Sequence, residues 1–176
     1  GLGVAAMGAH QVVLAVESIG FICADAFGIA GSALVAQQLG AEKKRDAQQI
    51  GWLNVLVSGA MLSILSVLFL FYPEALIRMI SNDPEVIRVG VPCLQVSAIA
   101  QPLMAMTCAL AGGLRGAGDT RNPIIAILIG PVAVRLFFCW LLAYHCGWGL
   151  IGIWVGSTLD WVARVIFLSW VFRRGR

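Results

Sequence analysis

The stretch that decides the fold is residues 47–73, AQQIGWLNVLVSGAMLSILSVLFLFYP, which contains no Asp, Glu, Lys or Arg. A helix needs roughly 20 apolar residues to cross the hydrocarbon core of a bilayer, and this stretch is longer than that. Residues 89–114 and 136–159 are two further stretches without a charged residue. The repeated occurrence of such long apolar runs predicts a protein that crosses a membrane several times.

The composition of the whole chain agrees with this interpretation. Hydrophobic residues make up 60% of the 176 positions and charged residues 12%, whereas soluble domains carry about 25% charged residues. The alternative is a soluble helical bundle with long buried helices, but runs of this length have no ordinary place in a soluble core. We expect an integral, multi-pass membrane protein whose immediate partner is the lipid bilayer, with no nucleic-acid partner.

Five membrane-spanning helices can be drawn, which predicts an all-α, polytopic transmembrane helix bundle. Their breaks have local causes, such as Pro73, which cannot continue the hydrogen-bond ladder of a helix, and Gly147 and Gly149, which favour a turn. The predicted spans cover residues 8–38, 47–72, 88–114, 122–144 and 149–172.

The basic residues predict the orientation of the chain. Eight of the twelve Lys and Arg fall at one set of alternating span ends, and only Arg78 and Arg88 fall at the opposite set. The positive-inside rule places the richer set in the cytoplasm. We therefore expect a cytoplasmic C-terminus, an external start and a location in the plasma (inner) membrane. The eight residues are Lys43, Lys44, Arg45, Arg115, Arg121, Arg173, Arg174 and Arg176.

The connection at residues 73–87 allows two interpretations. The apolar positions within 73–80 fit a short helix lying flat at the membrane surface, but an ordinary external loop fits equally well. Asp83 followed by Pro84 is typical of a helix start, with Asp83 as the N-cap and Pro84 at the first helical position.

Charged residues inside the spans are the candidate functional residues, because a charge at the bilayer centre costs at least about 2.5–3.5 kcal/mol. Asp160 and Arg164 lie four residues apart on one helix, so we expect them to share a face and neutralise each other. Arg135 needs an anion, which Asp160 or Asp25 could supply. The candidates for proton coupling or for lining a cavity are Glu17, Asp25, Gln101, Arg135, Asp160 and Arg164.

Asp25 has two competing interpretations. Paired with an arginine it is structural, and facing a water-filled cavity it can carry protons. Glu17 lies eight residues earlier, about 80° around the helix, so the two acids point broadly the same way.

Nothing in the sequence indicates an enzyme. No Ser-His-Asp set, phosphate-binding loop or paired metal ligands can be assembled. The five cysteines form no Cys-x-x-Cys pair, so we expect no disulfide framework, no metal site and no cofactor. Pro92, Pro102 and Pro131 lie inside predicted spans, where they kink a helix; kinked helices suit either a moving, cavity-lining wall or a static bundle.

Two stretches resemble a known family. Gly28-Ile29-Ala30-Gly31-Ser32-Ala33-Leu34-Val35-Ala36-Gln37-Gln38-Leu39-Gly40-Ala41 resembles the end of the eighth helix of multidrug and toxic compound extrusion (MATE) transporters. Gly113-Leu114-Arg115-Gly116-Ala117-Gly118-Asp119-Thr120 resembles their cytoplasmic turn between the tenth and eleventh helices. Ala9-His10-Gln11 and Gly152-Ile153-Trp154 fit more weakly.

The resemblance implies about five spans of a six-helix lobe from a twelve-helix transporter. The missing N-terminal lobe would then be a partner of this chain, which looks like part of the C-terminal lobe. The implied function is secondary active efflux of small amphipathic or cationic compounds by alternating access, with H+ or Na+ as the coupling ion. Some family members bind the cation with an acid in the tenth helix, whereas residues 89–114 hold none and have Gln101 and Met104 in that region. This departure favours proton coupling through Asp25 or through the missing lobe.

Two other functions remain open from the sequence. A lipid or lipid-linked-oligosaccharide flippase would also be all-helical, but more cationic residues would be expected to face its central cavity. A non-transporting membrane scaffold subunit would need no second lobe.

Overall fold

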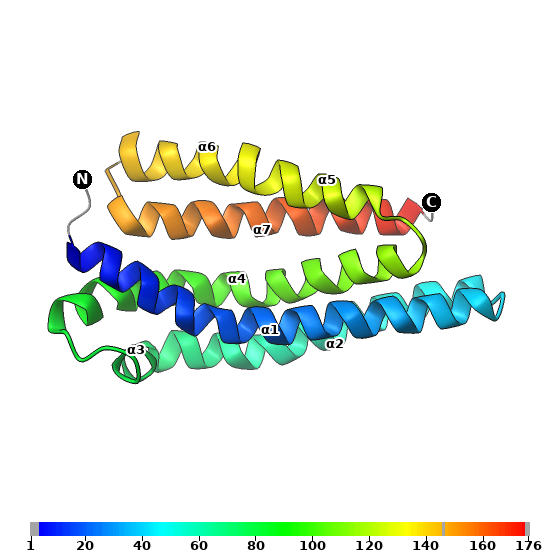
Figure 1. Ribbon diagram of the computed structural model, residues 1–176, viewed down its shortest axis with the longest axis horizontal. Helices are drawn as coiled ribbons and strands as arrows, with labels where there is room; N and C mark the ends of the chain where they lie inside the picture. Colours follow the sequence, from blue (N-terminus) through cyan, green and yellow to red (C-terminus); the bar gives the residue numbers. More distant parts are fainter. Residues whose placement is uncertain (1–3, 146, 175–176) are drawn as a thin grey trace.

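The computed structural model describes residues 4–145 and 147–174, and the described residues form a bundle of long helices (Figure 1). Five of these helices are long and apolar enough to cross a membrane, which confirms the predicted all-α transmembrane fold. Cys146, Arg176 and the first three residues, on which some of the sequence-based expectations fall, lie outside the described residues.

The spanning helices are slightly longer than the sequence predicts. Helix α1 runs from Val4 to Gly40 and α2 from Lys44 to Phe71, with the short helix α3, Pro73–Arg78, after them. Helix α4 spans Pro84–Gly116, and α7 spans Gly149–Arg174. The predicted fourth span begins as α5, Arg121–Ile129, and continues through η1, Gly130–Arg135, α6, Leu136–Cys139, and η2, Trp140–His145.

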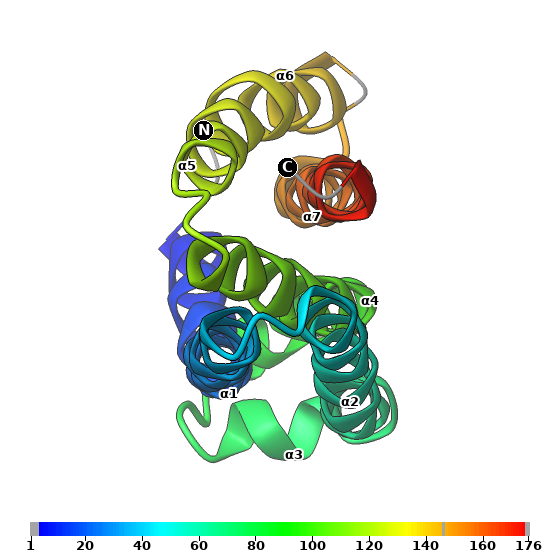
Figure 2. The same cartoon turned by 90° about the vertical axis from the view of Figure 1, so that its right-hand side faces the viewer.

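Helix α4 is the centre of the bundle. It packs against α1, α2 and α7, and Figure 2 shows it between these helices when the molecule is viewed end on. Its buried side includes Leu94, Met104 and Leu110, each at most 1% exposed. The apolar character of α4 therefore reflects contacts inside the chain as well as contact with lipid.

Glycines bring the backbones of α1 and α4 into contact. A Cβ atom added to Gly112 would overlap the carbonyl oxygen of Gly28, and one added to Gly116 would overlap that of Ser32. Gly31 leaves room for the side chain of Asn54, whose amide donates a hydrogen bond of 3.0 Å from α2 to the carbonyl oxygen of Phe27. The two family-like stretches, far apart in the sequence, therefore form one helix–helix contact.

The prolines of α4 are accommodated inside a continuous helix. Pro102 has no N–H group, so the carbonyl oxygen of Ala98 loses its usual donor. The hydroxyl of Ser66 on α2 donates to that oxygen at 2.6 Å. This bond ties α2 to α4 at the point where the helical ladder is interrupted.

The connection between α2 and α4 contains a helix, as the first of the two interpretations proposed. Helix α3 holds only six residues, with Ile77 fully buried and Glu74 paired with Arg78 on its exposed side. The side chain of Asp83 accepts a hydrogen bond of 2.9 Å from the backbone N–H of Glu85. The predicted N-cap at Asp83 is thus confirmed.

The segment from Arg121 to His145, here called the arm, differs from a simple proline-kinked helix. From Gly130 onward its turns widen to π-helical geometry, first around Pro131 and again from Trp140 to His145. The arm packs along α7 and touches α4 only near α5, and Figure 2 shows it set apart from α1 and α2. Pro131 predicts a kink at this position, whereas the structure has π-helical turns here, which shift the helical register of the residues that follow.

Candidate functional site

A cleft of about 300 Å³ opens between α1, α4, the arm and α7. It brings together an acid and a base that the sequence singled out separately, Glu17 from α1 and Arg135 from the end of η1. Its lining residues are Leu14, Glu17, Ser18, Phe21, Met104, Arg135, Ser157 and Trp161. A cleft with charges, an aromatic ring and a thioether can hold a ligand that is part polar and part apolar.

Glu17 and Arg135 are the charged residues of the cleft. Both side chains are half-buried, and neither forms an ion pair within 4.0 Å among the described residues. Their opposite charges attract each other across the cleft, but the two side chains are not in contact. Both groups therefore remain available to a ligand or to an ion.

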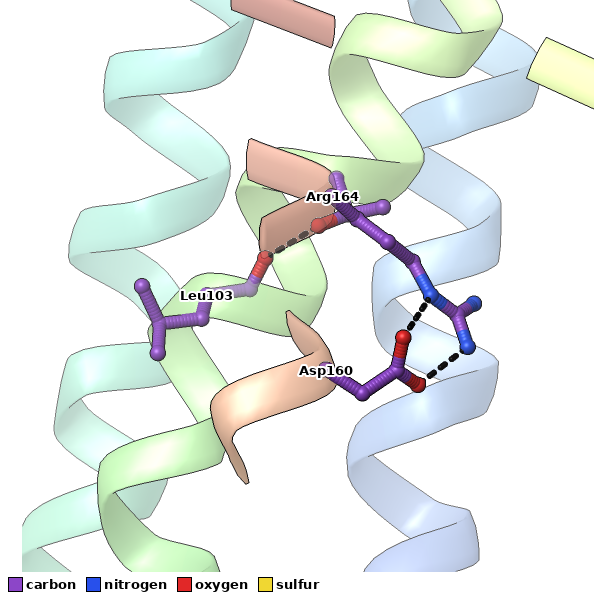
Figure 3. Close-up of polar contacts among 4 residues, drawn as sticks. Leu103, Asp160 and Arg164 are labelled. Atoms are coloured by element: carbon purple, nitrogen blue, oxygen red, sulfur yellow. Dashed lines mark hydrogen bonds and ion pairs between the residues drawn. The ribbon is translucent and has the colours of Figure 1, made fainter. Parts of the chain in front are cut away.

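Asp160 and Arg164 form the self-neutralising pair that their spacing predicts (Figure 3). Asp160 is fully buried and Arg164 is 8% exposed. The Nε of Arg164 donates to Oδ1 of Asp160 at 2.8 Å, and its Nη2 donates to Oδ2. The guanidinium also lies 4.6 Å from the centre of the Trp161 ring. The pair is therefore a buried structural element of α7 in which each charge is already neutralised by the other.

The acid nearest to Arg135 in the cleft is neither of the two that the sequence offers, Asp160 and Asp25. Asp160 is bound to Arg164, and Asp25 forms no ion pair with Arg135 in the described part of the chain. The acid in the cleft is Glu17. Asp25 lies about 12 Å farther along α1 than Glu17 as well as about 80° around it, and its side chain is exposed instead of lining the cleft.

Gln101 is buried without a polar partner. Its side chain is fully buried, and neither Oε1 nor Nε2 has a hydrogen-bond partner in the structure. A Cβ atom on Gly20 would overlap its Oε1, so the amide fills space that this glycine leaves open on α1. Gln101 therefore lies in the contact between helices, outside the residues that line the cleft.

Sequence reasoning did not assign Trp161 or Ser157 to the site. Both come from α7, four residues apart and hence on one face of the helix, and both line the cleft. The available signal was the position of Trp161, directly after Asp160 and three residues before Arg164.

The two weaker family-like stretches, residues 9–11 and 152–154, meet near the N-terminal end of α1. The rings of His10 and Trp154 lie 5.6 Å apart between their centres. Nδ1 of His10 and Nε1 of Trp154 are both buried without a hydrogen-bond partner in the structure. This contact joins α1 to α7, and these two helices form two walls of the cleft.

The structure describes four cysteines, Cys23, Cys93, Cys108 and Cys139, and all four are free. Within the described residues, no group of three His, Cys, Asp or Glu is arranged to hold a metal ion.

Solved structures with the same fold include one described as inward-facing and one described as outward-facing. The chain matches a structure described as the inward-facing conformation of a multidrug resistance MATE family transporter of the MOP superfamily, with a TM-score of 0.88, 20% identity and coverage of 97% of this chain and 39% of that one. A structure described as the outward-facing conformation of such a transporter gives a TM-score of 0.88, 21% identity and coverage of 98% and 38%.

Sequence comparison extends the likeness to curated proteins. A probable multidrug resistance protein NorM from Thermotoga maritima is 28% identical over 177 residues, which is 99% of this chain and 38% of the relative. The chain thus spans about 38% of the length of the relatives it matches first. The family is one of membrane transporters and not of enzymes, as the sequence predicted. The pattern of the MatE family matches residues 1–141, and the chain therefore belongs to the MatE family.

Proposed function

We propose that this chain is part of a secondary active transporter that exports small amphipathic or cationic compounds. The observation that carries the proposal is the cleft between α1, α4, the arm and α7, where Glu17 and Arg135 face a common space beside Trp161. The carboxylate of Glu17 attracts a cationic group, and the Trp161 ring and Met104 offer apolar contact. The relatives' description as multidrug resistance proteins supports the same substrate class.

The proposed mechanism is alternating access, in which this part of the protein moves as a rigid body. The support is the equal TM-score of 0.88 to structures described as inward-facing and outward-facing. A segment that changed shape between these states would fit one of them better than the other. The backbone contact between α1 and α4 gives a physical reason for such rigidity, because close-packed backbones leave little room for sliding.

The proposed coupling ion is H+ or Na+, and its exchange with substrate takes place at Glu17. A cation and a positively charged substrate compete for one carboxylate, so binding of one promotes release of the other. Asp25 is the second candidate on the same helix. A flippase for anionic lipid-linked sugars would be expected to have several cations free in its cavity. Arg164 is bound to Asp160, so Arg135 is the cation that lines the cleft without a bound acid among the described residues. The flippase therefore has little support.

The proposed setting is the inner membrane, with the end that carries Lys43, Arg115 and Arg173 in the cytoplasm. Figure 1 shows the α1–α2 turn, the α4–α5 turn and the end of α7 on one side of the bundle. A cysteine introduced at Ala41 should be protected from an impermeant reagent added outside, and one at Gly147 should react. The opposite labelling pattern would reverse the orientation.

Efflux from proteoliposomes tests the function, using a protein of the relatives' length that carries this chain. Glu17→Gln should fold normally and lose ion-driven efflux of a cationic dye. Glu42→Gln is the matched control, because Glu42 lies exposed in the turn between α1 and α2. Separate H+ and Na+ gradients identify the ion, and Asp25→Asn measured alongside shows which acid carries it. Normal efflux by Glu17→Gln would refute the assigned role of the cleft.

A further inference from the structure

The two ends of the bundle differ in whether their basic residues form ion pairs. At the end that holds the α2–α4 connection, Arg78 is paired with Glu74 at 2.6 Å and Arg88 with Glu85 at 2.9 Å. At the other end, no described Lys or Arg lies within 4.0 Å of an acid. The described residues of that end include seven Lys and Arg and three acids, Glu42, Asp46 and Asp119. This end therefore carries positive charge that the chain itself does not neutralise.

One of these cations lies over a tryptophan ring where α2 meets α7, and a second lies on the same face of α2 as that tryptophan. The guanidinium of Arg173 lies 5.6 Å from the centre of the Trp52 ring, and the ring is held edge-on by Phe172 at 5.5 Å. Arg45 lies seven residues before Trp52, which puts both on one face of α2 about 10 Å apart along the axis. We call Arg45, Trp52 and Arg173 the Trp52 seam.

The surface below the Trp52 seam is apolar and exposed. Leu56, one turn beyond Trp52 on α2, is 65% exposed, and Ile166, two turns before Arg173 on α7, is also 65% exposed. The helical repeat places Leu56 on the same face of α2 as Trp52, and Ile166 on the same face of α7 as Arg173. Both lie closer to the middle of the bilayer. The order along the membrane normal is thus cations, then an aromatic ring, then aliphatic side chains.

We propose that the Trp52 seam binds an anionic phospholipid. The phosphate lies between Arg45 and Arg173, because guanidinium groups bind phosphate through paired hydrogen bonds. The glycerol region lies against Trp52, as expected for a tryptophan at the membrane interface. The acyl chains lie along Leu56 and Ile166. This inference is independent of the proposed transport function and of the orientation of the protein.

Topology alone does not account for this arrangement. The positive-inside rule requires cations near the ends of spans, but it does not require an arginine placed over a tryptophan ring. Binding of added lipid to the purified protein separates the two explanations, because no membrane then imposes an inside and an outside.

The test uses native mass spectrometry of the protein titrated with phosphatidylglycerol, with phosphatidylcholine as the neutral reference lipid. The wild type should bind phosphatidylglycerol first. The double variant R45Q/R173Q should raise the apparent Kd of the first bound phosphatidylglycerol about 25-fold, taking about fivefold for each cation removed near the surface. R173K should give an intermediate loss, because lysine keeps the charge but does not stack as guanidinium does.

The matched control is R78Q/R88Q, which removes two arginines from the other end and should leave this Kd within about twofold. Size-exclusion chromatography checks that each variant is folded, and the single variants R45Q and R173K replace the double variant if it is not. Unchanged binding by the folded seam variants would overturn the proposal, as would an equal loss in the control or equal affinity for both lipids. Displacement of phosphatidylglycerol by millimolar inorganic phosphate would assign the seam to a free anion instead.

Discussion

Helix α4 and the arm are both apolar segments of spanning length, yet the chain holds them in different ways. In an apolar 18-residue window of each, 61% of the residues of α4 are buried inside the chain, compared with 11% of those of the arm. Helix α4 is in backbone contact with α1 at Gly112 and Gly116, whereas the arm is in backbone contact with α7 at Gly152 and Gly156 and touches α4 only through α5. Hydrophobicity marks a segment as membrane-spanning in both cases, whereas the number of neighbouring helices decides how much of the segment is buried on protein.

The Asp160–Arg164 pair lies where these two regions meet, so breaking it should have the largest effect. Asp160→Leu leaves a buried arginine without its acid, which should lower the free energy of unfolding by about 3–5 kcal/mol. Asp160→Leu combined with Arg164→Met removes both charges and should recover most of this loss. Thermal unfolding in detergent, followed by size-exclusion chromatography, measures both variants. Equal instability of the single and double variants would mean that the pair contributes through packing and not through charge.

The contact between α1 and α4 provides the second test. Gly112→Ala places a methyl group against the carbonyl oxygen of Gly28, which cannot move aside as a side chain can, so we expect a loss of about 1–3 kcal/mol. Gly40→Ala is the control, because an added Cβ there meets no heavy atom within 4 Å. Its effect should be neutral or slightly stabilising. If both alanines behave alike in a melting experiment, the close approach of the helices is not what fixes α4.

A smaller effect is expected where the arm meets α7. A methyl group on Gly130 would overlap the side chains of Asp160 and Arg164 instead of backbone. Side chains can shift, so Gly130→Ala should lower the free energy of unfolding by about 1 kcal/mol, at the low end for overpacking. Hydrogen exchange should show the change first in residues 121–135. Protection that stays unchanged in the arm but falls in α4 would contradict the assignment of this glycine to the arm–α7 contact.

The smallest effect is expected on the outer surface of the arm. Leu136 is 62% exposed and packs little against the rest of the chain. Leu136→Ala should therefore change the free energy of unfolding by no more than about 0.5 kcal/mol. A larger loss in the same melting assay would show that this face of the arm packs against something outside the described residues.

The sequence predicts the five spanning helices well because each depends on a local property, the length of an apolar run. It also predicts the Asp160–Arg164 pair and the Asp83 cap, since both partners lie within four residues of each other. The π-helical turns of the arm were missed. Pro131 predicts an interrupted ladder but does not specify how the following turns rearrange.

The membership of the cleft was harder to predict, because it depends on how far each helix is rotated against its neighbours. Glu17 and Asp25 lie on one helix with a modest angular difference, yet only Glu17 lines the cleft with Arg135. The absence of an acid from residues 89–114 makes Asp25 a candidate for proton coupling in the sequence. Burial and rotation, which the sequence does not contain, decide which of the two acids lines the cleft.

The hydrogen bond from Ser66 to the carbonyl oxygen of Ala98 has a consequence for how this chain can vary in evolution. Pro102 creates the unfilled acceptor and Ser66 fills it, so each residue is useful only in the presence of the other. In homologous proteins, the two positions should change together, with a serine or threonine kept at the first wherever a proline stands at the second. A proline that arose before its donor would leave an unsatisfied carbonyl in the membrane, so the order of substitution is constrained as well.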